Sequence, residues 1–157
     1  MSTDSEILET SRETPGAFAE LFERHARVIG AFAARRVGVD AAEDILSETF
    51  LVAFRRRADF DSTWASAKPW LLGIASRIIK KHHAQEAAQW RSVAASISRG
   101  EHTSDGAIDA AGGRADASAA VRALAPRIAP LAARDRETLL LYAWGALTYE
   151  EIAVALG

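Results

Sequence analysis

One stretch of the chain combines an aromatic residue with basic residues at a spacing that suits contact with nucleic acid. If residues 69–91 form a helix, residues spaced by three, four or seven positions share one face. The residues on this face are Trp70, Gly73, Arg77, Lys80, Lys81 and Ala84. Basic groups neutralise phosphates, and an indole offers a surface on which an unpaired base stacks. The pattern favours a surface for single-stranded nucleic acid. The alternative is a solvated basic face on which Trp70 caps the core.

The segment before this helix, residues 59–68, has the composition of a loop. Its sequence, DFDSTWASAK, places short polar residues around Trp64, and such residues favour turns over helix. Trp64 therefore offers a second aromatic surface close to the basic face.

A second helix, predicted over residues 40–57, shows a different pattern. Its apolar residues point nearly all round: Ile45, Leu46, Phe50, Leu51, Val52 and Phe54. Its polar residues form a stripe of Asp44, Glu48 and Arg55, with Ser47 beside it. A helix that is apolar on more than one side is either buried or has a second partner. Two interpretations stay open: a core helix with a solvated stripe, or a helix that docks on another protein.

The residue types that carry catalysis or bind metals are not arranged for either task. The chain has no cysteine, and neighbours on a helix point about 100° apart, so His82 and His83 do not chelate one metal together. The sequence has no Gly-x-Ser-x-Gly motif and no glycine-rich phosphate loop. We therefore expect no catalytic residue, no metal, no cofactor and no enzymatic activity.

Charge is distributed unevenly along the 157 residues, whose formal net charge is -2. Residues 1–23 hold six acidic residues and one basic residue, whereas residues 68–99 hold six basic residues and one acidic residue. Apolar residues make up 49% of the chain, which is enough for a core. No stretch approaches 18 uninterrupted apolar residues, so we expect no membrane insertion. The lack of cysteine fits a reducing cytoplasm.

The fold class predicted from these patterns is all-α. Strand signals are nearly absent, and helical periodicity recurs along the chain. A first helix is expected to open at Thr14 with Pro15 in the first helical position, and Gly38 suits its C-terminal end. A capping box of Asp40 and Glu43 is expected to open the next helix.

The predicted organisation has four parts. Residues 1–13 form an acidic N-terminal tail, and residues 14–91 form a three-helix bundle. Residues 92–117 are rich in glycine and serine and read as a flexible linker. Residues 118–157 form a C-terminal helical piece.

The C-terminal piece has the pattern of the front part of a helix-turn-helix. We expect helices over residues 118–125 and 135–144, with Gly145 as the stop, and a last helix that opens at the capping box of Thr148 and Glu151. The second helix of such a motif would come after Gly157.

Four stretches, in this order, resemble a sigma factor of the sigma-70 family, in its extracytoplasmic-function (ECF) group. FAELFERHARVIGAFAARRVG is similar to the start of sigma region 2. AEDILSETFLVAFRRRADFD resembles the polymerase-docking helix, and KPWLLGIASRIIKKH resembles the promoter-melting helix. LAARDRETLLLYAWGALTYEEIAVALG resembles the opening of region 4.

The resemblance implies a transcription initiation factor in the cytoplasm that binds core RNA polymerase and promoter DNA. It places the contacts with the clamp helices of the β′ subunit at Asp44, Ser47, Glu48, Phe50 and Phe54. It places the contacts with the −10 element, including the loop that receives a flipped base, at Asp61, Ser62, Trp64, Lys68, Trp70, Arg77, Lys80 and Lys81. A complete region 4 would contact the β flap, and an anti-sigma factor is a common partner in this group.

Two features depart from the family pattern. Arg77 stands where an asparagine is common, which exchanges a base or backbone contact for a phosphate contact. Region 4 stops at Gly157, before the recognition helix that reads the −35 element, so a truncated region 4 is expected.

Two other classes of protein fit parts of the pattern. A helix-turn-helix regulator would bind duplex DNA and would not need the acidic stripe. A helical adaptor protein would carry the basic face as a solvated surface and would not bind DNA.

Overall fold

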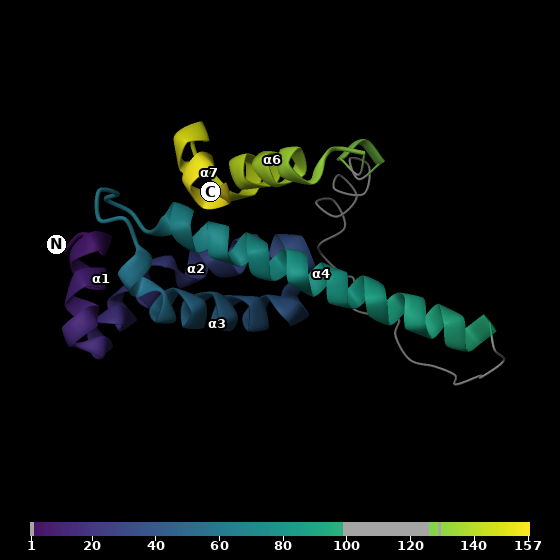
Figure 1. The fold of residues 1–157 in the computed structure, drawn as a ribbon, viewed down its shortest axis with the longest axis horizontal. Helices are drawn as coiled ribbons and strands as arrows, with labels where there is room; N and C mark the ends of the chain where they lie inside the picture. Colours follow the sequence, from purple (N-terminus) through teal and green to yellow (C-terminus); the bar gives the residue numbers. More distant parts are fainter. Residues whose placement is uncertain (1, 99–125, 129) are drawn as a thin grey trace.

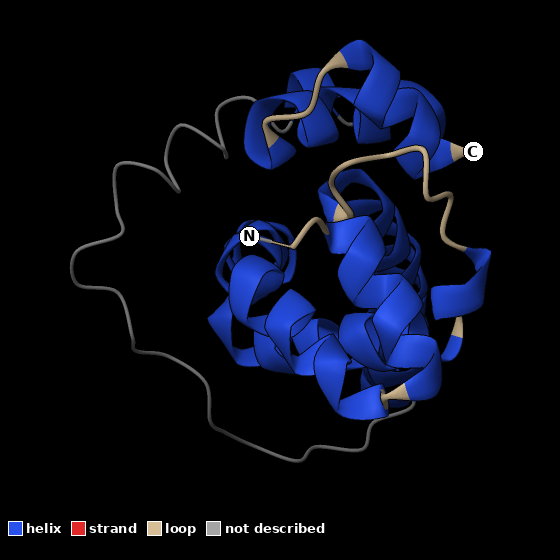
Figure 2. Cartoon of the chain, turned by 90° about the vertical axis from the view of Figure 1, so that its left-hand side faces the viewer, coloured by secondary structure: helices blue, strands red, loops and turns tan. Residues whose placement is uncertain are grey.

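The computed structural model describes residues 2–98, 126–128 and 130–157, and for residues 86–98 it describes the backbone alone. All regular structure in these residues is helical, as Figure 2 shows, so the predicted all-α class is confirmed.

Four helices form the main body. They are α1 (Asp4–Glu13), α2 (Phe18–Val37), α3 (Val39–Arg55) and α4 (Lys68–Ser98). Helices α2, α3 and α4 pack along one another, and α1 lies across one end of this group (Figure 1). Short 3-10 helices, Pro15–Ala17 and Arg57–Asp59, join α1 to α2 and follow α3.

The core follows the predicted periodicity of each helix. On α4, the apolar side predicted from the sequence is buried: Leu71, Leu72, Ala75, Ile78 and Ile79. Leu21, Ile29 and Phe32 of α2 belong to the same core and are almost fully buried. Burial of a large apolar side chain stabilises the fold by about 1.5–3 kcal/mol.

The junction of α2 and α3 differs from the prediction at one point. Gly38, with a φ of 83°, ends α2 as expected, but the same residue also precedes the first residue of α3, Val39. Asp40 is therefore already inside the helix, where no side-chain cap is formed. The predicted capping box of Asp40 and Glu43 is wrong, because a single glycine at positive φ makes the whole turn.

Residues 1–13 are not a tail apart from the bundle, because α1 occupies most of them. Its capping box joins Thr3 and Glu6: the Glu6 N–H donates to Thr3 Oγ1, and the Thr3 N–H donates to Glu6 Oε2. Ile7 and Leu8 are buried in the main core. The sequence prediction missed this helix because two adjacent apolar residues among acids do not show a helical period.

The long helix α4 passes the predicted end of the bundle at residue 91 and continues to Ser98. The first residues of the predicted linker, 92–98, are therefore helical. The rest of that linker and the helix predicted over residues 118–125 lie outside the described residues.

Two helices form the C-terminal piece, α6 (Ala133–Gly145) and α7 (Tyr149–Leu156). The predicted capping box at the start of α7 is confirmed, with the Glu151 N–H donating to Thr148 Oγ1. Gly145 is the last residue of α6, and Ala146 takes the left-handed conformation that follows.

The C-terminal piece packs against the main body (Figure 1). Gly145 is buried, and a Cβ on it would lie 3.1 Å from the Leu72 side chain of α4. Ile152 and Ala155, on the apolar side of α7, are buried in the same core. The C-terminal piece is therefore packed on the N-terminal body through a shared apolar core.

Candidate functional site

The polar stripe of α3 is on the surface. Asp44, Ser47 and Glu48 are all exposed, and their spacing places them on one side of the helix. Neither acid forms an ion pair with a basic side chain in the part of the chain that the structure describes. Leu51, the next residue along this side, is 48% exposed. The stripe is available to a partner that brings positive charge.

The two aromatic residues predicted to join this stripe lie elsewhere. Phe50 is buried, with its ring centroid 4.8 Å from that of Phe22 and 6.4 Å from that of Phe18. Phe54 is half-buried between the Phe18 ring, at 5.2 Å, and the Arg57 guanidinium, which lies 4.1 Å from its ring centre. The structure therefore separates the predicted set: three polar residues face solvent, while Phe50 and Phe54 hold α3 against α2.

The loop between α3 and α4 is folded around Asp61. Its carboxylate accepts hydrogen bonds from the Thr63 N–H at 3.0 Å and from the Thr63 hydroxyl at 2.8 Å. These two bonds lower the pKa of Asp61. Asp61 and Ser62 are exposed and Trp64 is half-buried, so the loop presents polar groups beside an aromatic ring.

Helix α1 holds this loop in place. The Ser5 hydroxyl is placed to donate to the carbonyl oxygens of Trp64, at 2.6 Å, and of Ser62, at 3.2 Å. Asp4 accepts a hydrogen bond from the Ala67 N–H at 2.8 Å. The first turn of α1 therefore bonds both arms of the loop, a role that the sequence analysis did not assign. The capping box at Thr3 and Glu6 was the signal that would have revealed a helix here.

Asp4 is the centre of a buried polar cluster. Its carboxylate oxygens lie 3.1 Å from Arg24 Nη1 and 2.7 Å from His25 Nε2, both on α2. Burial alone would raise the pKa of Asp4, but the hydrogen bonds from Ala67, His25 and Arg24 outweigh it and lower that pKa below its ordinary value. One carboxylate thus joins α1, α2 and the loop.

This cluster predicts a dependence of stability on pH. Because folding lowers the pKa of Asp4, its stabilisation is present above the ordinary value of 3.8 and is lost as pH falls through the folded value. Asp4→Asn should lower the free energy of unfolding at pH 7 by about 1–3 kcal/mol. The variant should also lose less of its free energy of unfolding than wild type as the pH falls below 3.8. Urea unfolding of both proteins at several pH values measures this, and parallel pH profiles would contradict it.

The predicted basic face of α4 is divided by the C-terminal helices. Lys68 Nζ donates to the Ala146 carbonyl at 3.3 Å, and an Arg77 N–H donates to the Ala155 carbonyl at 3.5 Å. Gly73 is buried under α7. Lys80 and Lys81 are exposed. Trp70 is half-buried, with its ring centroid 5.3 Å from that of Phe60, so part of the indole is a core contact.

These helices define a bundle with an exposed acidic stripe on α3 and a basic face with aromatic residues on α4. Residues 21–89 match the family described as Sigma-70 region 2. This match covers α3 and most of α2, together with the described side chains of α4. Residues 21–89 therefore resemble sigma-70 region 2, and the predicted resemblance to the sigma-70 family is confirmed. No curated protein matches the chain.

A sigma-70 region 2 gives the chain a role in transcription initiation, with RNA polymerase and promoter DNA as partners. Helices α1, α6 and α7 lie outside the matched residues. Among the described residues, no group of three or more His, Asp or Glu side chains is placed to hold a metal ion. None of the helices in the described part of the chain is long and apolar enough to cross a membrane.

Proposed function

We propose that this protein is a sigma factor of the ECF type. It binds core RNA polymerase, directs it to promoters and helps to open the −10 element. The observation that carries this proposal is the match to region 2 together with two separate exposed surfaces of opposite charge, one on α3 and one on α4.

The acidic stripe of α3 docks on the polymerase. Asp44 and Glu48 are exposed and without basic partners in the described residues, so a basic helical surface of the β′ clamp can pair with both. Complementary charge across an interface speeds association and selects the partner. The contacts of the Phe50 and Phe54 rings with Phe18 keep the stripe turned outward.

The loop at residues 61–67 and the start of α4 engage the melted DNA strand. Such a loop reads sequence by holding an unstacked base, and the contacts must offset a few kcal/mol of unstacking. The bonds from Asp4 and Ser5 fix the loop before DNA arrives, which lowers the entropic cost of binding. Trp64 and Trp70 offer the stacking surfaces, and Lys80 and Lys81 contact phosphates.

The C-terminal helices must leave α4 before DNA can use the whole basic face. Lys68 and Arg77 are bonded to the backbone of Ala146 and Ala155, and Gly73 is covered. The protein itself carries out no covalent chemistry in this proposal, since nucleotide addition belongs to the polymerase. It acts in the cytoplasm, where the polymerase works.

The decisive experiment is a pull-down with core RNA polymerase followed by promoter-dependent run-off transcription. Polymerase binding with promoter-dependent transcripts is the expected result. Duplex DNA binding without polymerase binding would instead identify a helix-turn-helix regulator. Binding to neither polymerase nor single-stranded DNA would identify a helical adaptor.

A charge variant on α4 tests the phosphate contacts. Lys80→Ala with Lys81→Ala should weaken binding to single-stranded DNA with little dependence on sequence. It should also reduce the slope of log affinity against log salt by about 1.4, because each phosphate contact in single strands contributes about 0.7. Fluorescence anisotropy at several salt concentrations measures the slope. Arg27→Ala with Arg55→Ala removes the same charge from α2 and α3 and should leave the slope unchanged.

A further inference from the structure

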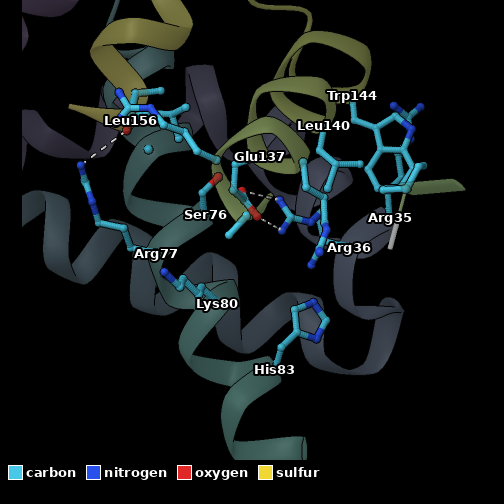
Figure 3. Close-up of a pocket in the computed structure, with 16 residues that line it drawn as sticks. Arg35, Arg36, Ser76, Arg77, Lys80, His83, Glu137, Leu140, Trp144 and Leu156 are labelled. Atoms are coloured by element: carbon cyan, nitrogen blue, oxygen red, sulfur yellow. Dashed lines mark hydrogen bonds and ion pairs between the residues drawn. The ribbon is translucent and has the colours of Figure 1, made fainter. Parts of the chain in front are cut away.

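A hollow of about 800 Å³ lies where the C-terminal piece meets the main body. The end of α2, the middle of α4 and both C-terminal helices surround it, as Figure 3 shows. Sites for small molecules in proteins usually have volumes of about 300–1,000 Å³. The hollow is therefore of a size that suits a small ligand.

The charge around this hollow is strongly positive. Its lining holds His83 and six arginine and lysine side chains: Arg35, Arg36, Arg77, Lys80, Arg134 and Arg136. One acidic side chain, Glu137, is also in the lining, and Arg36 binds both of its carboxylate oxygens at 2.6 and 3.1 Å (Figure 3). In the described part of the chain, Arg35, Lys80 and Arg134 form no ion pair. Positive charges gathered in this way repel one another unless an anion joins them.

A buried hydroxyl in the lining, that of Ser76, has no bonding partner among the described residues. Ser76 is 5% exposed, and its Oγ forms no hydrogen bond within the described residues. An unsatisfied buried polar group costs about 1–3 kcal/mol, and native proteins keep few of them. Ser76 lines the hollow from α4, between the basic residues of α2 and α4. A ligand oxygen in the hollow would accept this hydrogen bond.

The lining is not entirely charged. Leu140 and Trp144 form an apolar part on one side, Leu156 lines the other side (Figure 3), and Trp144 is half-buried. An indole gives a flat surface on which a nucleobase stacks. The hollow thus combines arginines suited to phosphate with an aromatic ring suited to a base.

We propose that this hollow binds a small nucleotide that carries two or more phosphates. Five of the six arginine and lysine side chains are arginines, whose planar forks bind phosphate oxygens in pairs. Figure 3 places Arg35 beside Trp144, and Lys80 and Ser76 across the Arg36–Glu137 pair from them, so the ligand spans the hollow and its chain of phosphates runs from Arg35 toward Lys80 and Ser76. The base lies against Trp144.

Such a ligand would hold the C-terminal helices on α4. It contacts α2 and α4 on one side and α6 on the other, so its binding stabilises the arrangement in which they are together. Lys80 then faces the ligand and Arg77 stays bonded to Ala155, so neither is free for DNA. Nucleotide and promoter DNA would therefore compete, a consequence that rests on the proposed function.

Calorimetric titration of the 157-residue chain tests the site. The probes are adenosine triphosphate, guanosine triphosphate, inorganic tripolyphosphate and a short single-stranded oligonucleotide. We expect saturable binding of one nucleotide per chain, more weakly for tripolyphosphate, which lacks a base. Arg35→Ala and Arg134→Ala should each raise the dissociation constant about tenfold, and Ser76→Ala should raise it several-fold. Arg55→Ala, which removes a charge outside the hollow, is the matched control.

Arg35 and Arg134 are exposed, so their variants should keep the wild-type melting temperature, which a thermal scan checks. The proposal is overturned if neither nucleotide saturates, or if Arg55→Ala weakens binding as much as the lining variants do. Equal affinity for tripolyphosphate would overturn the nucleotide assignment, and tighter oligonucleotide binding through Arg35 and Arg134 would make the hollow part of a DNA surface. The titration uses neither polymerase nor promoter, so its failure leaves the proposed function standing.

Discussion

Reversal of the two exposed acids of α3, by Asp44→Lys with Glu48→Lys, is expected to weaken binding to core RNA polymerase about tenfold to hundredfold. This corresponds to about 1–3 kcal/mol. The reason is that both side chains would change from attracting a basic partner surface to repelling it. Neither acid takes part in an ion pair of the described structure, and both are exposed. The helix and the core should therefore survive the change.

The matched control reverses two other acids at the same spacing. Glu9→Lys with Glu13→Lys changes the net charge by the same amount on α1, where both side chains are also exposed. Surface plasmon resonance with immobilised core polymerase, at two salt concentrations, compares the variants with wild type. If the α3 variant and wild type bind polymerase with equal affinity, α3 is not part of the interface. An equal loss of affinity in the α1 variant would show that the effect comes from net charge and not from the position of the acids on α3.

The parts of the fold that the sequence predicted well are those in which local pattern and burial agree. The apolar side of α4 shows a clear helical period, and it is buried as predicted. Gly38 and the capping box at Thr148 depend on backbone chemistry within a few residues. These features need no knowledge of distant parts of the chain.

The candidate site was harder to predict, because its geometry depends on which side of each helix meets the core. The nearly uniform apolar character of α3 did not distinguish Phe50, which is buried, from Leu51, which is exposed. The contacts of Asp4 with His25 and Ala67 join segments 21 and 63 residues apart. Spacing along one helix carries no information about such contacts.

Gly73 illustrates the same limit in a way that can be tested. In the sequence it is one small residue on the basic face of α4, whereas in the structure the backbone of α7 lies directly against it. A Cβ built on Gly73 would lie 2.3 Å from the carbonyl oxygen of Ala155. Because that atom is backbone, no side-chain rotation can relieve the clash, and α7 must move away.

Gly73→Ala is therefore expected to detach α7, and α6 with it, from α4. The change removes a buried contact that includes Ile152 and Ala155, so amide hydrogen exchange in α6 and α7 should rise by an order of magnitude or more. Exchange in α3 should stay as in wild type, since α3 packs on α2 and α4. Release of Arg77 from Ala155 should at the same time raise the affinity for single-stranded DNA several-fold.

Gly30→Ala is the matched control for this prediction. Gly30 lies within α2, and a Cβ there would meet the Leu46 side chain at an ordinary contact distance of 3.8 Å. Alanine in place of glycine inside a helix stabilises it by up to about 1 kcal/mol. Gly30→Ala should therefore leave hydrogen exchange in α6 and α7 unchanged, with a melting temperature equal to or above that of wild type. If hydrogen exchange in α6 and α7 is the same in Gly73→Ala as in wild type, the docking of α7 does not depend on its close approach to residue 73. In that case α7 does not cover α4 in the way that the structure shows.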